Sequence, residues 1–258
     1  FSSYKHNLKL LHNRLFHIGE KLVRATADAC TGAPSISPRE HLDPCTACVD
    51  GSGHHSAVAP ARAARAPRDP ALRLVHTDWW GPYKTPGPSG ERYLQCFIDD
   101  ASGFAHVYAS RSKDCGAENL AHFSALIREL TNNASSVHLV QADYERVYTH
   151  GTFAALCRMA GYLQRFSAPY THQHNGRAER FWRTLEEHVS SAFSHSKAPI
   201  RLWPFAVQTF VAHRNSSASS THALSPMERL TGQKPDISNL RTWGCPVSAF
   251  LEKADRAK

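Results

Sequence analysis

Long apolar segments are absent from this sequence of 258 residues. No stretch approaches the roughly 20 consecutive apolar residues that a helix needs to cross a bilayer, and no secretory signal opens the chain. We therefore expect no membrane partner. Methionine is also missing from position 1, where Phe1 stands, so we expect a fragment or a processed product of a longer protein.

Acidic residues are in deficit, with 22 Asp and Glu against 30 Lys and Arg, which gives a formal net charge of +8. This balance favours a polyanionic partner, and nucleic acid before a membrane surface because no amphipathic basic helix is present. Hydrophobic residues make up 41% of the chain and aromatic residues 10%. A core of useful size can therefore be buried, which excludes a disordered protein.

Internal repeats are lacking too, and the composition changes along the chain. Residues 1–50 are rich in His and Cys, and residues 51–71 are a low-complexity stretch of Ala, Arg, Pro and Gly. We predict a small unit at 1–50, a flexible basic linker at 51–71 and a larger folded unit from residue 72.

From residue 72, apolar runs of strand length alternate with segments of helical periodicity. A meander of three strands is followed by helix, strand, helix, strand and further helices, an order that predicts a mixed sheet flanked by helices. The expected strands are 72–77, 93–99, 105–110, 137–142 and 162–166, and the expected helices are 116–131, 152–160, one after the Asn175-Gly176 turn, 200–213 and 226–231.

Two of the expected strands end in aspartate, at Asp78 in "RLVHTDWWGP" and Asp143 in "VHLVQADYER". Acids in such places lie at the edge of the sheet, where open α/β sheets bind ligands. Glu179, in the first turn of a helix, is a candidate third acid. Three clustered carboxylates need cations, and oxygen ligands suit Mg²⁺. Two such ions about 3.5–4 Å apart can promote an in-line phosphoryl displacement.

Each acid also has an ordinary structural explanation. Asp78 and Asp143 can simply begin turns, and the pair Asp99-Asp100 in "FIDDASG" is most simply a turn as well. Glu179 can form a surface ion pair with Arg183, four residues further along the helix.

The first 50 residues contain a pair of histidines, His12 and His17, and a closely spaced pair of cysteines, Cys45 and Cys48. Two imidazoles and two thiolates can form a closed tetrahedral site for structural Zn²⁺. The spacing of the histidines turns about 140° on a straight helix, so we expect one of them beyond a helix end.

Chance pairing remains an alternative, because the chain has 17 histidines and seven cysteines. An odd cysteine count without a secretory signal favours reduced thiols. Substitute ligands are Cys30, His41 and His54. The other cysteines are expected to pack as small apolar residues: Cys96, Cys115, Cys157 and Cys245.

Asp143 and Glu179 have 35 residues between them, the spacing typical of the retroviral-type integrase and transposase superfamily. The sequence resembles most closely the integrases of Ty1/copia-type retrotransposons. The residues that carry this resemblance are "LVHTDWWGP", "RYLQCFIDDASGFAHVYASRSK", "PYTHQHNGRAERFWRTL", "SPMERLTGQKP" and "LRTWGC", and they cover roughly 72–250. "LHNRLFHIGEKL" with "CTAC" resembles the HHCC zinc segment that precedes these cores.

This resemblance implies an α/β RNase H-like fold at 72–250, with a mixed five-stranded sheet, a small helical HHCC zinc-binding domain before it and the start of a C-terminal tail at 251–258. It implies Asp78, Asp143 and Glu179 as catalytic ligands of two Mg²⁺ or Mn²⁺ ions, and His12, His17, Cys45 and Cys48 as ligands of structural Zn²⁺. Candidate DNA contacts are Gln173, Asn175, Arg177, Arg180 and Arg183.

The implied function is an integrase that processes the 3′ ends of element DNA and joins them to target DNA. The chain would be part of a larger Gag-Pol polyprotein, would form homo-oligomers on DNA and would act in the nucleus after a cytoplasmic stage in virus-like particles. Two alternatives stay open: the same fold acting as a binding module without chemistry, and an RNase H-type nuclease.

Two departures from the family pattern bear on this choice. The family places a glycine-rich turn after its second aspartate, where this chain has the bulkier Tyr144-Glu145-Arg146-Val147. His172 stands where proline is usual.

Overall fold

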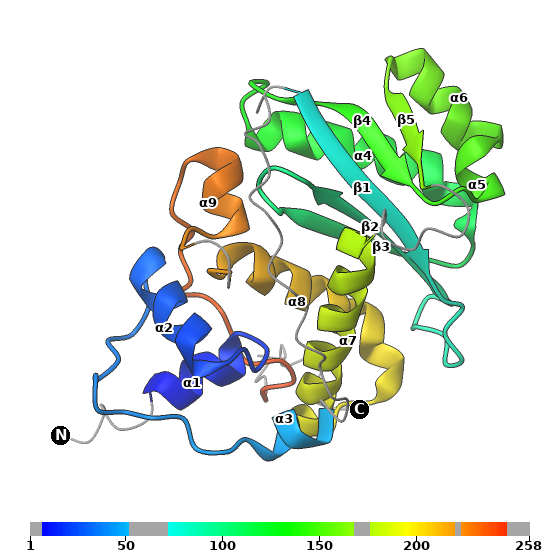
Figure 1. The fold of residues 1–258 in the computed structure, drawn as a ribbon. Coiled ribbons are helices and arrows are strands. Elements are labelled where there is room, and N and C mark those ends of the chain that lie inside the picture. The colour runs from blue at the N-terminus through cyan, green and yellow to red at the C-terminus, as the bar shows by residue number, and fades with distance from the viewer. Residues whose placement is uncertain (1–6, 52–71, 168–175, 220–222, 247–258) are drawn as a thin grey trace, which may run out of the picture.

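The computed structural model describes residues 7–51, 72–167, 176–219 and 223–246. Its centre is one five-stranded sheet with helices on both faces (Figure 1). Within these residues, no helix has both the length and the apolar character needed to cross a membrane.

The strands are β1 (Leu72–Trp80), β2 (Tyr93–Asp99), β3 (Ala105–Ser110), β4 (Ser136–Ala142) and β5 (Leu163–Phe166). They lie in the order β3-β2-β1-β4-β5. β2 pairs antiparallel with both β1 and β3. β4 pairs parallel with both β1 and β5. This mixed topology is that of the RNase H-like fold, so the fold expected from the sequence is confirmed.

One boundary differs in a way that matters for the candidate site. The sequence placed Asp78 just after a strand, but β1 continues to Trp80 because Trp79 and Trp80 still pair with Gln95 and Leu94 of β2. Asp78 therefore lies inside a hydrogen-bonded strand, where its backbone is fixed on the β2 side.

Two hydrophobic layers cover the faces of the sheet, and β2 shows how one strand serves both. Cys96 and Ile98 face the layer formed with α7 (Gly176–Ser196) and α8 (Trp203–Ser216). Phe97 points the other way, into the layer formed with α4 (Gly116–Leu130) and α6 (Gly151–Ala160). This follows from the two-residue alternation of side chains in a strand.

The remaining helices are short. α5 (Arg146–Thr149), which the sequence did not predict, follows β4. α9 (Pro226–Thr231) has the expected signals: the Ser225 hydroxyl accepts the Glu228 N–H, and Gly232 ends the helix at φ 76°. Two 3-10 turns, Lys113–Cys115 and Ile200–Leu202, precede α4 and α8.

The N-terminal segment packs directly on this core. It contains α1 (Asn7–Arg14), α2 (Glu20–Ala29) and α3 (Thr46–Gly51). Leu8 and Leu11 share a buried cluster with Ile237, and Phe16 enters the layer under α7 and α8. The segment expected to form a separate zinc domain therefore shares its buried surface with the core, as the neighbouring positions of α1, α2, α8 and α9 illustrate (Figure 1).

Helix α3 lies against the C-terminal half of α7, and the contact depends on the absence of a side chain at Gly51. A Cβ added there would lie 2.7 Å from the backbone nitrogen of Ser191 and 2.9 Å from its Cα. These are backbone atoms of a helix interior, so they cannot move aside without bending α7. Glycine is required here by close approach.

We predict that Gly51→Ala separates α3 from α7 and destabilises the chain by about 1–3 kcal/mol, as overpacking does elsewhere. Thermal melting should then fall by roughly 2–4 °C per kcal/mol. The matched control is Gly19→Ala, where nothing lies within 4 Å of an added Cβ and φ is −62°. Since Gly19 caps α2, its loss should stay below about 1 kcal/mol. Equal melting temperatures for the two variants would contradict the close contact.

Candidate active site and metal centre

The parallel pairing of β1 with β4 brings two aspartates near each other. His76 of β1 pairs with Gln141, close to the end of β4. Asp78 lies two residues further along β1, and Asp143 is the first residue after β4. The negative charge of Asp143 acts on Asp78, so the two carboxylates expected to act together lie close together.

Asp78 is held by two N–H donors and is partly buried. The backbone N–H of Trp79 donates to Oδ1 at 2.9 Å, and the indole Nε1–H of Trp182 donates to Oδ2 at 3.0 Å. Burial first, and the negative charge of Asp143 second, raise the pKa of Asp78 to about 7, against the opposing effect of the two N–H donors. The site favours a proton, or a cation in its place, over an uncompensated carboxylate.

Glu179 lies in the exposed first turn of α7. Trp182, three residues later, reaches Asp78, and residues three apart are neighbours on a helix surface. The start of α7 therefore lies beside the two aspartates. Among the described residues no ion pair joins Glu179 to Arg183, and the three acids do not form a group with all ligand atoms at binding distance.

The donor chemistry of this place suits hard cations. Asp78 and Asp143 offer carboxylate oxygens near each other, each oxygen of Asp78 keeps a free lone pair beyond its one N–H bond, and Glu179 is exposed in the first turn of α7. Oxygen donors of this kind are the ligands that Mg²⁺ and Mn²⁺ bind.

The residues proposed as DNA contacts divide into three groups. Gln173 and Asn175 lie outside the described residues. Arg180 and Arg183 are exposed on the first two turns of α7. Arg177 differs, because its Nη1 donates to Asp100 Oδ1 at 2.8 Å and so binds within the protein.

The turn after β2 was interpreted from the sequence as a simple turn, and the structure shows more. Asp99 is fully buried and accepts from Arg73 at 2.7 Å and from the Ser102 N–H at 2.7 Å. Asp100 accepts from His76 at 2.9 Å and from Arg177. One feature of the sequence indicates these contacts. Arg73 and His76 are basic residues within an apolar strand, and buried basic residues need acidic partners.

The second site lies in the N-terminal segment, where four side chains converge as expected. The ligand atoms of His12, His17, Cys45 and Cys48 all lie within 4.8 Å of one another. His17 lies beyond the end of α1, which confirms that the two histidines do not share a helix. Phe16 and His17 adopt left-handed backbone angles, φ 56° and 62°, and this turn directs His17 back toward His12.

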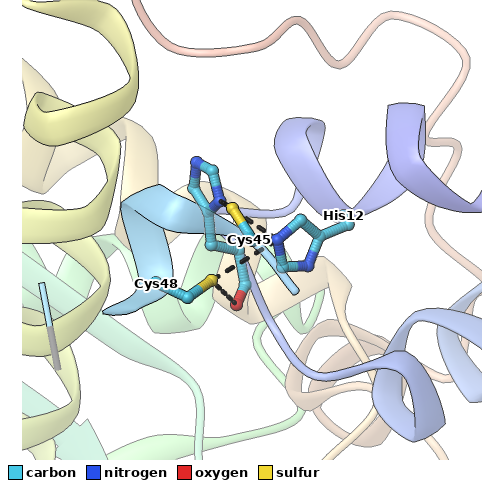
Figure 2. Close-up of side chains that lie close together, drawn as sticks. His12, Cys45 and Cys48 are labelled. Carbon is cyan, nitrogen blue, oxygen red and sulfur yellow. Dashed lines mark hydrogen bonds between the residues drawn. The ribbon is translucent and has the colours of Figure 1, made fainter. Parts of the chain in front are cut away.

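Three distances in this cluster are close to those around a tetrahedral ion. Sγ of Cys48 lies 3.5 Å from His12 Nε2 (Figure 2). Sγ of Cys45 lies 3.4 Å from His17 Nδ1, and this nitrogen lies 3.1 Å from His12 Nε2. Tetrahedral Zn²⁺ with the usual bond lengths would separate nitrogen from sulfur by about 3.6 Å and two nitrogens by about 3.3 Å.

Hydrogen bonding prepares His12 as a ligand. Its Nδ1 lies 2.9 Å from the Ile18 carbonyl oxygen and donates to it, which leaves Nε2 as a lone pair facing the cluster. Burial lowers the pKa of His12 and lowers that of His17 to about 4, while burial and the neighbouring Cys45 raise the pKa of Cys48 to about 12. Both imidazoles are therefore neutral, and a bound cation would have to displace a thiol proton.

The substitute ligands considered from the sequence lie elsewhere. Cys30 Sγ donates to the Ser216 carbonyl, and the exposed His41 lies beside Glu20. His54 is outside the described residues. Of the cysteines expected to pack as apolar residues, Cys96 and Cys157 are buried and Cys115 is partly buried, but Cys245 is exposed, so that expectation was wrong for Cys245 because its loop lies at the surface.

Together the RNase H-like sheet, the paired aspartates and the preceding His/Cys cluster define an integrase-like class of protein. No family model matches the chain. It is 30% identical over 253 residues to the retrovirus-related Pol polyprotein from transposon TNT 1-94 of Nicotiana tabacum, covering 98% of this chain and 18% of that polyprotein. Along nearly its whole length the chain is thus homologous to Ty1/copia-type Pol polyproteins.

Other relatives agree. The Pol polyprotein from transposon RE2 of Arabidopsis thaliana is 24% identical, covering 96% of this chain and 16% of its own length. The Ty1-ML2 Gag-Pol polyprotein of Saccharomyces cerevisiae is 25% identical, covering 95% and 14%. The chain thus spans less than a fifth of these relatives. Among solved structures, the catalytic core of BIV integrase aligns with 17% identity and a TM-score of 0.43 over 60% of this chain and 91% of that one.

The raised pKa of Asp78 predicts how stability depends on pH. Between pH 3.8, the ordinary pKa of the group, and about pH 7, the folded chain binds a proton at Asp78 more tightly than the unfolded chain does. The free energy of unfolding therefore falls as pH rises through this range. We expect Asp78→Asn to raise the melting temperature at pH 8 by roughly 2–4 °C, corresponding to about 1 kcal/mol, when divalent ions are absent.

The gain should shrink toward pH 4, where Asp78 of the folded wild type already carries a proton. The control is Asp28→Asn, at an exposed position of α2, which should show no such trend. A constant difference between Asp78→Asn and the wild type at all pH values would contradict the assigned titration.

Proposed function

We propose that this chain acts as an integrase, which processes the 3′ ends of element DNA and joins them to target phosphodiesters by phosphoryl transfer with two Mg²⁺ or Mn²⁺ ions. The observation that carries this proposal is the closeness of Asp78 and Asp143, where burial and the charge of Asp143 raise the pKa of Asp78 to about 7 beside the start of α7. Similarity to Ty1/copia-type Pol polyproteins supports it.

Asp78, Asp143 and Glu179 would hold the ions. When bound, the ions supply activation of the attacking water or 3′ hydroxyl and stabilisation of the leaving oxygen. Trp79 and Trp182 fix the Asp78 carboxylate through their N–H groups, so its orientation does not depend on substrate. No protein nucleophile is required, because the oxygen attacks phosphorus directly.

We propose that Arg180 and Arg183 contact the DNA backbone. Both are exposed on the turns of α7 that flank Glu179 and Trp182. Arginine contacts to phosphate position the duplex and carry no base information by themselves. Gln173 and Asn175, just before α7 in sequence, are proposed to complete this surface.

The first test is a joining assay. Purified chain with Mn²⁺ and an oligonucleotide matching the element end should join that end to plasmid DNA. Asp143→Asn and Glu179→Gln should lower joining by at least about 10³-fold, since each removes an ion ligand, while DNA affinity stays the same. Glu187→Gln, on the same helix two turns beyond Glu179, is the matched control and should join normally.

A second function, a DNA-binding module of the same fold, is favoured by the residue that follows Asp143. The exposed Tyr144, packed on Phe166 at 5.6 Å between ring centroids, stands directly after Asp143. Binding of the element end by the wild type without joining would establish this function and overturn the integrase.

We further propose that His12, His17, Cys45 and Cys48 bind one structural Zn²⁺. The support is the fit of their distances to a tetrahedral ion and the preset tautomer of His12. Because α3 carries Cys48 and packs on α7, the ion would stabilise more than its own loop.

Removal of this ion should be visible along the chain. We expect a chelator to raise amide hydrogen exchange in residues 7–51 and in the C-terminal half of α7, where Asp50 accepts from Ser194 and Phe16 O accepts from His188. Cys48→Ser should reduce the zinc content measured by atomic absorption, whereas Cys30→Ser, at a cysteine outside the cluster that likewise donates to a carbonyl oxygen, should not. Identical zinc content in the two variants would refute the ligand set.

The wider setting is proposed from the family. The chain would work as part of, or after release from, a larger Pol polyprotein, and would form homo-oligomers on the element ends. Its site of action would be the nucleus, after a cytoplasmic stage in virus-like particles.

A further inference from the structure

Residues 99–103, which we call the acidic turn, join β2 to β3 and contact four separate elements. Asp99 accepts from Arg73 of β1, Arg214 of α8 donates to the Gly103 carbonyl at 2.9 Å, and Arg229 of α9 donates to the Ser102 carbonyl at 3.0 Å. The turn is therefore fixed to the sheet and to two helices before α7 is considered.

Asp100 connects this fixed turn to both halves of the acid site. Its Oδ1 accepts from His76, two residues before Asp78 on β1, and from Arg177, two residues before Glu179 on α7. The acid thus links the strand that carries one catalytic candidate to the helix that carries another.

The Asp100–Arg177 pair is partly removed from water. The side chain of Asp100 is 4% exposed and that of Arg177 is 28% exposed. A charged hydrogen bond in such a place is short and directional, and loss of Arg177 removes the guanidinium that compensates the buried Asp100 carboxylate and leaves His76 as its other donor.

The guanidinium of Arg177 lies against the backbone of the acidic turn, next to Gly103. A Cβ at Gly103, where φ is +79°, would lie 3.5 Å from Nη2 of Arg177, so the guanidinium lies over the backbone of the acidic turn. Arg177 is thereby directed inward, toward the turn.

We propose that Asp100 and Arg177 are positioning residues for the acid site. Together with His76 they attach the first turn of α7 to β1 at a fixed height, so that Glu179 stands beside Asp78 and Asp143. This role rests on the proposed integrase function, and it takes Arg177 out of the set of DNA contacts.

The attachment itself is tested without activity. In Arg177→Met and Asp100→Asn, the backbone amides of residues 180–184 should exchange with deuterium at least about tenfold faster than in the wild type, because the first turns of α7 open more often. Arg177→Lys, which keeps the charge, should restore part of the protection. Arg183→Met is the control on the same helix and should leave these amides unchanged.

The functional consequence is tested by metal and DNA binding. Arg177→Met should weaken Mn²⁺ binding at the acid site, measured by electron paramagnetic resonance, and lower the joining rate by about 10²-fold, the effect of a displacement near 1 Å. Its DNA affinity and salt dependence should match those of the wild type. Arg183→Met should instead weaken DNA binding and reduce the salt slope by about one.

The opposite pattern would overturn the proposal: unchanged exchange at residues 180–184 in Arg177→Met and Asp100→Asn, with a loss of DNA affinity and of salt slope in Arg177→Met. If Asp100→Asn fails to fold, Arg177→Met and Arg177→Lys still decide the outcome. If the wild type joins no DNA, the proposed function fails, whereas the exchange data still show whether the attachment exists.

Discussion

The packing of α7 against the sheet and the N-terminal segment is the constraint on which both candidate sites depend. Near its start, Trp182 is buried in the layer under the sheet and donates to Asp78. Near its end, Ser191 lies in backbone contact with Gly51 of α3. Hydrophobic burial supplies most of the energy of such a helix, while a few polar contacts fix its height and rotation, and these decide where Glu179 stands.

Much of this arrangement could be predicted from sequence. The succession of strands and helices along the chain follows from alternating and continuous apolar runs. The His/Cys ligands follow from local spacing, since a pair such as Cys45 and Cys48 must lie close together in any fold. The closeness of Asp78 and Asp143 is harder to predict, because it depends on the register of β1 against β4, in which His76 pairs with Gln141. Family resemblance indicated it, whereas periodicity alone does not give a register.

The acidic turn and the docking of α3 could not be predicted in this way. Asp100 finds Arg177 across 77 positions of the chain, and only the folded molecule decides whether an arginine on a helix faces water or a buried acid. The same is true of Gly51, which has an unremarkable place in the sequence but lies where two helices touch. Such contacts are set by tertiary packing, which local propensity does not encode.

The length of α7 has one more consequence. Glu179 near its start and His195, whose ring lies 5.1 Å from that of His17, are separated by 16 residues, or about 24 Å along a helix with a rise of about 1.5 Å per residue. That exceeds the roughly 8 Å over which charges act through physiological salt. Ions bound at the two ends would therefore have a negligible electrostatic interaction. Any coupling between the two sites would have to be transmitted mechanically, through the rigid helix α7.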